Sequence, residues 1–270
     1  YHFSYTYSER QEINMISGKN IEIAYEKNIV IKDLDIEIKR GEILTILGTN
    51  GCGKSTLLKG ISRVIPYKNG TISLENEIIH NINSKEFAKR LAFVSQNNEI
   101  PEDITVEEFV RYGRTPHKKW YELLNEDDEK IVSWAMEICK IEKFSKRKVM
   151  SLSGGERQKV WIAMVLAQKT SVLLLDEPTT YLDICHQFEI MELIKELNKK
   201  LGITIVMVLH DLNQASQYSD RVLVLKDGKK YIEGDTREVL TKELVREVYK
   251  VEAEVEYYNE LPYFKLRGLL

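Results

Sequence analysis

The sequence of 270 residues has few of the features that mark several common classes of protein. Its three cysteines, Cys52, Cys139 and Cys185, lie far apart and form no CxxC pair, so free thiols are favoured over a disulfide framework. No apolar run approaches the ~18 residues that a membrane-spanning helix needs. The longest covers only residues 203–209, so any membrane role would come through a partner.

Positive and negative charges nearly balance, so the net charge is small. The formal net charge is −3, which leaves no basic surface signal for nucleic acid, and we expect no nucleic-acid partner. The content of 43% hydrophobic and 30% charged residues is ordinary for a globular protein with a large core. The first residues are polar and aromatic without periodicity, so we expect residues 1–15 to form a leader outside the fold, which would begin near Ile16 or Ser17.

The chain is organised around a glycine-rich stretch, residues 48–55, which reads GTNGCGKS and has the form GxxxxGK[ST] of a phosphate-binding loop. It lies between an apolar strand pattern (43–47) and a helix pattern (56–61), which is the context the motif requires. Glycines allow successive N–H groups to turn towards an anion, Lys54 would reach the β- and γ-phosphates, and Ser55 would place its hydroxyl on Mg²⁺. A glycine-rich turn that binds nothing is the alternative, but such a turn has no need of the Lys–Ser pair. The residues expected to surround the phosphates are Gly48, Thr49, Asn50, Gly51, Cys52, Gly53, Lys54, Ser55 and Thr56.

A second run, residues 171–177, is apolar from 172 to 175 and ends in two carboxylates, Asp176 and Glu177. Such a run predicts a strand buried on both faces, as in a parallel sheet. Unpaired buried acids cost several kcal/mol each, so these two should face a cation or a substrate. Asp176 suits Mg²⁺ and Glu177 suits orienting an attacking water, although a plain strand exit with solvated acids is the alternative.

Three other polar or aromatic residues lie at the ends of predicted strands. Gln96 follows the strand at 91–94 and His210 follows the strand at 203–209, and ligands bind at the carboxyl ends of strands in open α/β sheets. A histidine at a strand end is often structural, and it is the shared sheet edge that favours a functional role here. Tyr25 lies on a sheet edge, where stacking on adenine and simple packing are equally open.

Residues 97–150 have a different pattern, which predicts a mostly helical insertion without strands. Thr105 begins a capping-box pattern, and Asn125 could cap a second helix whose apolar face would hold Ile131, Trp134, Ala135 and Ile138. Next, the run LSGGERQ begins a long helix at Ser153, Gly154 and Gly155. Exposed N–H groups at this start predict a second anion site, with an ordinary capped helix as the alternative. We assign residues 97–160 to a helical subdomain.

Short-range turn signals bound the remaining elements. Glu75-Asn76 and Asp227-Gly228 predict two hairpins. A further helix is expected after residues 179–183, with Ile190, Leu193 and Leu197 on its apolar face, and Gly202 ends it. One or two short helices are expected between 236 and 249, followed by a C-terminal tail over residues 255–270. Cys52 is either a small residue tolerated in the phosphate loop or a reactive thiol.

The ordered set of these motifs resembles the ATP-binding subunit of an ABC transporter over roughly residues 16–254. In order along the chain, Tyr25 matches the aromatic loop, 48–55 Walker A and Gln96 the Q-loop. Residues 152–158 match the LSGGQ signature, with Glu156 in place of the usual Gln. Residues 172–176 match Walker B, Glu177 the catalytic acid, 181–183 the D-loop and His210 the switch histidine.

The resemblance implies an α/β fold of the P-loop NTPase class, with a RecA-like core, an antiparallel β subdomain and a helical signature subdomain. It implies ATP as substrate and Mg²⁺ held through Ser55, Gln96 and Asp176, with Glu177, His210, Gln96 and Lys54 in catalysis. It also implies a head-to-tail homodimer, in which Ser153, Gly154, Gly155 and Asp183 complete the nucleotide site across the interface.

A narrower resemblance, to the importers of iron–siderophores, haem and cobalamin, is carried by DEPTTYLDICHQ (176–187), GRTPH (113–117), VLT (239–241) and VEAE (251–254). It implies ferric siderophore as the first choice of cargo, membrane permease partners, a substrate-binding protein acting indirectly, and a place on the cytoplasmic face of the cell membrane. Arg114 and His117 would contact the permease, with a solvated loop as the alternative. A soluble ABC ATPase, such as an iron–sulfur assembly component, and a P-loop kinase are the competing functions.

Overall fold

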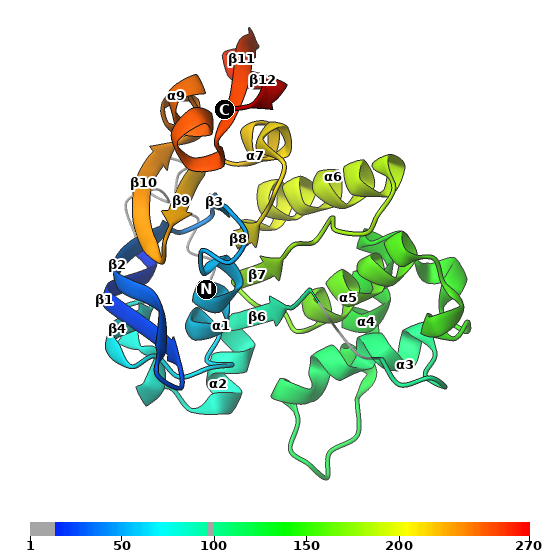
Figure 1. The fold of residues 1–270 in the computed structure, drawn as a ribbon. Helices are drawn as coiled ribbons and strands as arrows, with labels where there is room; N and C mark the ends of the chain where they lie inside the picture. Colours follow the sequence, from blue (N-terminus) through cyan, green and yellow to red (C-terminus); the bar gives the residue numbers. More distant parts are fainter. Residues whose placement is uncertain (1–13, 97–99) are drawn as a thin grey trace. The chain divides into compact units, whose positions relative to one another are not determined.

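The structure is a computed structural model that describes residues 14–96 and 100–270. It divides into two compact units, which are described separately: unit 1 combines the chain up to Asn81 with Thr204–Leu270, and unit 2 is Ile82–Ile203. Both units combine helices and strands, and each contains at least one parallel strand pair, so the predicted α/β class is confirmed. Figure 1 shows the elements in sequence colours.

One sheet of unit 1 is antiparallel and has the order β2-β1-β4-β5. Its strands are β1 (Asn14–Tyr25), β2 (Asn28–Lys39), β4 (Asn69–Leu74) and β5 (Glu77–Ile78). β1 begins slightly before the expected start of the fold, because Met15 is buried and its carbonyl accepts a hydrogen bond from the backbone N–H of Glu75 (2.9 Å). The rest of the expected leader, residues 1–13, lies outside the described residues.

The second sheet segment of unit 1 carries the phosphate loop. β3 (Ile43–Gly48) is parallel to β8 (Thr204–Val208) on one side and to β9 (Arg221–Lys226) on the other. β10 (Lys229–Asp235) is antiparallel to β9 across the predicted Asp227-Gly228 turn. Every residue of β3 and β8 is buried, as the apolar runs predicted. Two helices follow these strands directly: α1 (Lys54–Ile61) after β3 and α7 (Leu212–Tyr218) after β8.

The C-terminal part of unit 1 is more ordered than the expected tail. After α8 (Thr236–Val239), α9 (Lys242–Leu244) and a π-helical turn (Val245–Tyr249), β11 (Val251–Tyr258) and β12 (Leu261–Leu269) form an antiparallel hairpin. β11 crosses the predicted boundary at residue 254. The hairpin is fixed to α7 because Asn213 bonds both backbone groups of Phe264 (2.7 and 3.1 Å) and the Ser216 hydroxyl donates to the Pro262 carbonyl (2.6 Å).

Unit 2 contains one parallel strand pair and most of the helices. β6 (Leu91–Val94) pairs with β7 (Val172–Asp176). The helices are α2 (Ser84–Arg90), α3 (Val106–Arg111), a 3₁₀ segment (Tyr112–His117), α4 (Glu126–Ile138), two 3₁₀ turns (Glu142–Phe144 and Val149–Ser151), α5 (Gly154–Ala167) and α6 (Ile184–Leu201). Between residues 100 and 150 the only β contact is an isolated bridge from Thr105 to Lys148, and the regular elements there are all helical.

Among the described residues, no helix is both long enough and apolar enough to cross a membrane.

Candidate functional site

The phosphate loop of unit 1 takes a backbone path that requires glycine. Gly48, Gly51 and Gly53 have φ angles of 141°, 76° and 104°. These angles lie where L-residues are strained, so the loop needs glycine at these three positions. Gly48 also has no room for a side chain, since a Cβ there would lie 2.3 Å from the Leu225 carbonyl oxygen. The glycines thus give the loop a path that residues with a Cβ would not take, directly before α1, and its role in phosphate binding stays a prediction.

Lys54 is the first residue of α1, and its ammonium lies against the loop itself. The Nζ atom donates to the carbonyl oxygens of Gly48 and Thr49, both at 2.9 Å, and only 5% of the residue is exposed. A buried ammonium held over a glycine-rich loop places positive charge where a phosphate would lie. Ser55 and the buried Thr56 follow in the first turn of the same helix.

Tyr249 supports the loop from the far end of the chain and was not predicted. The backbone N–H of Gly48 donates to the Tyr249 hydroxyl (3.0 Å), and burial raises the pKa of that phenol above its usual value. Tyr249 therefore fixes the point at which β3 becomes the phosphate loop. Its position 201 residues away from Gly48 means that no local sequence signal could have revealed it.

Cys52 packs inside the loop and is buried. A Cβ on Gly48 would come within 2.7 Å of its Sγ, so the thiol fills space against the start of the loop. Burial raises the pKa of this thiol, although the nearby Lys54 acts in the opposite direction. A buried thiol with little thiolate is poorly reactive, so the structure favours the space-filling role over the reactive one.

The other two predicted residues of unit 1 are exposed. Tyr25 is the last residue of β1, and 44% of it is accessible, which leaves its ring open for stacking. His210 follows β8 as predicted and is also exposed. The next residue, Asp211, caps α7 by accepting from the N–H groups of Asn213 and Gln214.

In unit 2 the structure brings Glu177 and Gln96 together. Gln96 Nε2 donates to Glu177 Oε2 (2.7 Å), and the Thr180 hydroxyl donates to the same oxygen (2.9 Å). Glu177 has a φ of 55°, which is uncommon for a residue with a side chain and points to a constrained backbone at this strand end. Its carboxylate is thus held in one orientation, next to the buried Asp176 at the end of β7.

The signature segment forms a capped helix start. The N–H of Glu156 donates to the Ser153 hydroxyl (3.3 Å), and the N–H of Ser153 donates to the Glu156 carboxylate (2.8 Å). This capping box explains how Glu156 fits in place of the usual Gln, and its hydrogen bonds to Ser153 lower the pKa of the Glu156 carboxyl. Ser153 and Gly154 are exposed, and Gly155 is buried.

Two observations indicate that the residues present could bind a magnesium–nucleotide ligand. The positive-φ glycines and the buried Lys54 ammonium make an anion cradle in unit 1. The expected metal ligands, the Ser55 hydroxyl, the Gln96 amide and the Asp176 carboxylate, offer hard oxygen atoms of the kind that Mg²⁺ prefers. Tyr25, the phosphate loop and His210 belong to unit 1, whereas Gln96, Ser153–Gly155, Asp176, Glu177 and Asp183 belong to unit 2.

Arg114 is not available for contact with a permease, contrary to the sequence-based expectation. Its side chain is 8% exposed; Nε donates to Asp128 Oδ1 (3.0 Å) and Nη1 donates to the Ala167 carbonyl (2.7 Å). The His117 ring bonds the Gln168 carbonyl (2.8 Å), and a Cβ on Gly113 would lie 2.0 Å from the Met164 carbonyl. The GRTPH run therefore packs against the last carbonyls of α5, where basic groups are favourable.

We expect Arg114→Ala to lower the free energy of unfolding by roughly 3 kcal/mol, the lower end for breaking a buried ion pair. Asp128, which is 5% exposed, keeps a second partner in Lys118. Burial alone would raise the pKa of Asp128, but hydrogen bonds from Lys118, Asn125 and Arg114 outweigh it and lower the pKa to about 2. A depressed pKa stabilises the fold above the unfolded value near 4, and this stability is lost as the pH falls towards 2.

Urea unfolding at pH 7 and at pH 3 measures the loss of stability in Arg114→Ala and the dependence of stability on the protonation of Asp128. Lys130→Ala is the matched control, because its ion pair with Asp127 on the same helix is largely exposed and should contribute less than about 1 kcal/mol. Equal losses in the two variants would contradict the assignment of Arg114 to the core of unit 2.

Comparison with known proteins gives matches over most of the chain. Residues 31–180 match the family described as ABC transporter. The petrobactin import ATP-binding protein FpuC of Bacillus anthracis is 47% identical over 250 residues, which is 93% of this chain and 92% of that protein. The iron(3+)-hydroxamate import ATP-binding protein FhuC of Bacillus subtilis is 44% identical over 243 residues, 90% of each chain.

Solved structures of ATP-binding cassettes match as well. One is a dimeric cassette in a post-hydrolysis state bound to ADP and Pi. It is 31% identical, with a TM-score of 0.72, and the match covers 82% of this chain and 99% of that chain. The predicted P-loop NTPase fold class is thereby confirmed.

Proposed function

Because this chain belongs to the ABC transporter family of ATP-binding proteins, we propose that it is the ATP-hydrolysing motor subunit of a ferric siderophore importer. The observation that carries the proposal is identity of 44–47% over at least 90% of the chain to two ATP-binding proteins whose names specify iron–siderophore import.

Unit 1 would bind the triphosphate. The N–H groups of the glycine-rich loop and the Lys54 ammonium would surround the β- and γ-phosphates, and the exposed Tyr25 ring would stack on adenine. Ser55, Asp176 and Gln96 would hold Mg²⁺. Bound there, the ion would neutralise charge on the phosphates and thereby ease attack on the γ-phosphorus.

Glu177 would orient the attacking water. Its carboxylate is held by hydrogen bonds from Gln96 and Thr180, so little reorganisation is needed when water arrives. His210, which is exposed after β8, would contact the γ-phosphate and hold the geometry for in-line attack.

A second copy of the chain would complete each site. The exposed Ser153 and Gly154 at the start of α5 offer N–H groups to an anion, and the solved cassette bound to ADP and Pi is a dimer. In a head-to-tail homodimer, Ser153–Gly155 and Asp183 of one copy would close over the nucleotide bound by the other. Release of phosphate would weaken this closure, and the helical subdomain (97–160) would pass the opening to the permease.

The cargo follows from the named relatives, one a petrobactin and the other a ferric hydroxamate import protein. Ferric siderophore is therefore favoured over haem and cobalamin. A soluble ABC ATPase acting in iron–sulfur assembly is not favoured, because both relatives are import proteins over nearly their whole length.

Uptake measurements test this proposal. Cells that lack the gene for this chain should lose uptake of a ferric siderophore and keep uptake of haem and cobalamin. Expression of the wild-type chain should restore uptake, and a permease should be recovered with the tagged chain from membranes. Normal siderophore uptake by the deletion strain would refute the assigned cargo.

A further inference from the structure

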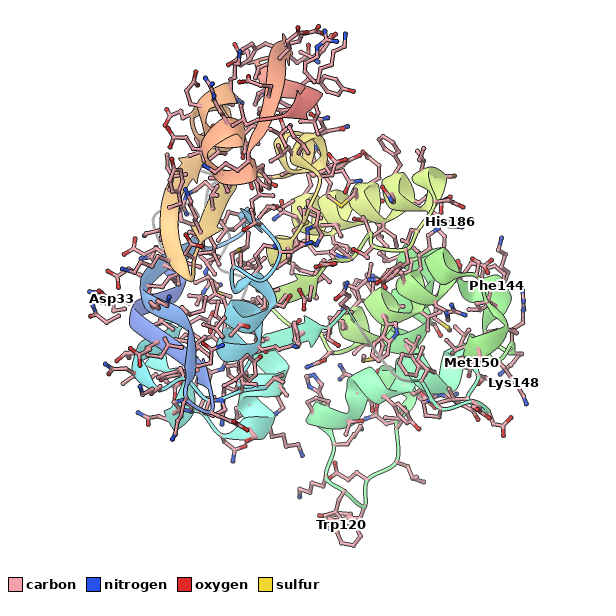
Figure 2. All side chains as sticks on the ribbon, viewed as in Figure 1. Asp33, Trp120, Phe144, Lys148, Met150 and His186 are labelled. Atoms are coloured by element: carbon pink, nitrogen blue, oxygen red, sulfur yellow. The ribbon has the colours of Figure 1, made fainter. Side chains whose placement is uncertain are left out.

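His186 connects two segments that the proposed dimer places at the nucleotide. It lies in the first turn of α6 (Figure 2). Asp183 caps this helix by accepting from the backbone N–H of His186 (2.9 Å), and the same oxygen bonds the His186 ring nitrogen Nδ1 (2.8 Å). Hydrogen bonds from His186, first that of the backbone and then that of the ring, lower the pKa of the Asp183 carboxyl.

The other side of the His186 ring packs on the signature helix. A Cβ on Gly155 would lie 2.2 Å from Cδ2, 2.4 Å from Cγ and 2.7 Å from Cβ of His186. The backbone of Gly155 is not in the left-handed region, so glycine is required here for space rather than for conformation. The imidazole thus occupies the volume that any other residue at position 155 would need.

An ion pair also holds α5 against α6, one turn further along both helices. Lys159, one turn after Gly155, pairs with Glu189, one turn after His186 (2.7 Å). The His186 ring thus has Asp183 as its hydrogen-bond partner and the backbone of Gly155 packed on it. Glu189 interacts with it electrostatically and is itself paired with Lys159.

We propose that His186 is a positioning residue that links the Asp183 turn to the signature glycines, so that both segments meet the partner copy's nucleotide as one surface. The inference rests on the proposed function, in which these segments close over the γ-phosphate. Nδ1–H donates to the Asp183 carboxylate and the ring packs on Gly155; no proton is transferred. Loss of the link lets the turn shift, which makes closure less favourable without touching the triphosphate site in unit 1.

Two substitutions separate the hydrogen bond from the ring. His186→Phe keeps a ring over Gly155 and removes the donor, whereas His186→Asn keeps an N–H donor near the position of Nδ1. Cys185→Ser, at the neighbouring exposed position, is the matched control. Should His186→Phe fail to fold, as judged by thermal unfolding, His186→Leu provides the same comparison.

For the full-length chain with Mg²⁺ and ATP, we expect His186→Phe to raise the ATP concentration for half-maximal hydrolysis about tenfold, the effect of losing one charge-assisted hydrogen bond. The maximal rate should change less than about threefold, because the hydrolytic residues are untouched. His186→Asn and Cys185→Ser should stay within about threefold of wild type. Binding of ATP at protein concentrations too low for dimers should be unchanged in all variants.

The inference is overturned if His186→Phe matches wild type, if His186→Asn is as impaired as His186→Phe, or if the maximal rate falls while half-saturation stays constant. Failure of the proposed function looks different: the wild-type chain itself would then show no ATP hydrolysis.

Discussion

Glu177→Gln slows ATP hydrolysis by roughly 10³-fold, the range seen when a preorganised polar group is removed from a transition state. The carboxylate is fixed by Gln96 and Thr180 at the end of β7, next to the buried Asp176. The amide keeps the size of the side chain but lacks the negative charge that we propose orients the attacking water. ATP binding should remain, because the phosphate loop and Lys54 belong to unit 1 and are unchanged.

Steady-state phosphate release and equilibrium titration with ATP measure the two quantities separately. Glu192→Gln, which removes an exposed carboxylate on α6, serves as the control and should hydrolyse ATP at the wild-type rate. A Glu177→Gln chain that hydrolyses ATP within tenfold of wild type would remove Glu177 from the catalytic role.

Lys54→Ala weakens ATP binding by about 100-fold, the effect of losing charge-assisted contacts worth ~3 kcal/mol. The ammonium is buried against the Gly48 and Thr49 carbonyls, so its loss removes both the charge and a support of the loop. Hydrolysis at low ATP concentration should fall in proportion. The change should leave unit 2 intact.

Calorimetric titration with ATP at constant ionic strength measures the affinity. Lys59→Ala, in the last turn of the same helix, is the matched control because it removes an equal charge away from the loop. Similar affinities for the two variants would mean that the buried ammonium does not contact the nucleotide.

Local signals predicted much of the fold. Glu75-Asn76 and Asp227-Gly228 have positive φ at both positions, as hairpin turns of this kind require. Thr105, Asn125 and Ser153 each form a complete capping box. These turns and caps could be predicted because each depends on residues within a few positions. The same holds for the strand ends that carry Gln96, Asp176, Glu177 and His210.

The buried face of a helix and the contacts between distant residues were harder to predict. In α4 the buried apolar positions are Val132, Ala135 and Met136, followed by Cys139 at the C-terminal cap, one step round the helix from most of the expected face. Apolar residues occupy both stripes, so periodicity cannot choose between them, and the packing against α3 and α5 decides. Tyr249 beneath the phosphate loop and the Arg114–Asp128 pair depend on tertiary contacts that no local pattern encodes.

The GRTPH run illustrates the limit of arguing from resemblance. Its position in the family pattern suggested a surface for the permease, yet Gly113 and Arg114 are buried against the end of α5. His117 bonds the Gln168 carbonyl but is partly exposed, so its contact with a permease stays a prediction. A motif shared within a subfamily can thus report a packing requirement rather than a partner.

The central claim is that two copies of the chain each provide one wall of a shared ATP site, and the mass of Glu177→Gln in solution tests it most directly. Gly154→Val supplies the comparison, because Gly154 is exposed and a Cβ there meets only Leu182 Cδ2, at 3.4 Å, so a new side chain has room to begin. With Mg²⁺ and saturating ATP, light scattering should give twice the 31.5 kDa chain mass for Glu177→Gln, and the single chain mass once Gly154→Val is added. A Glu177→Gln chain that binds ATP and stays at 31.5 kDa would contradict the account.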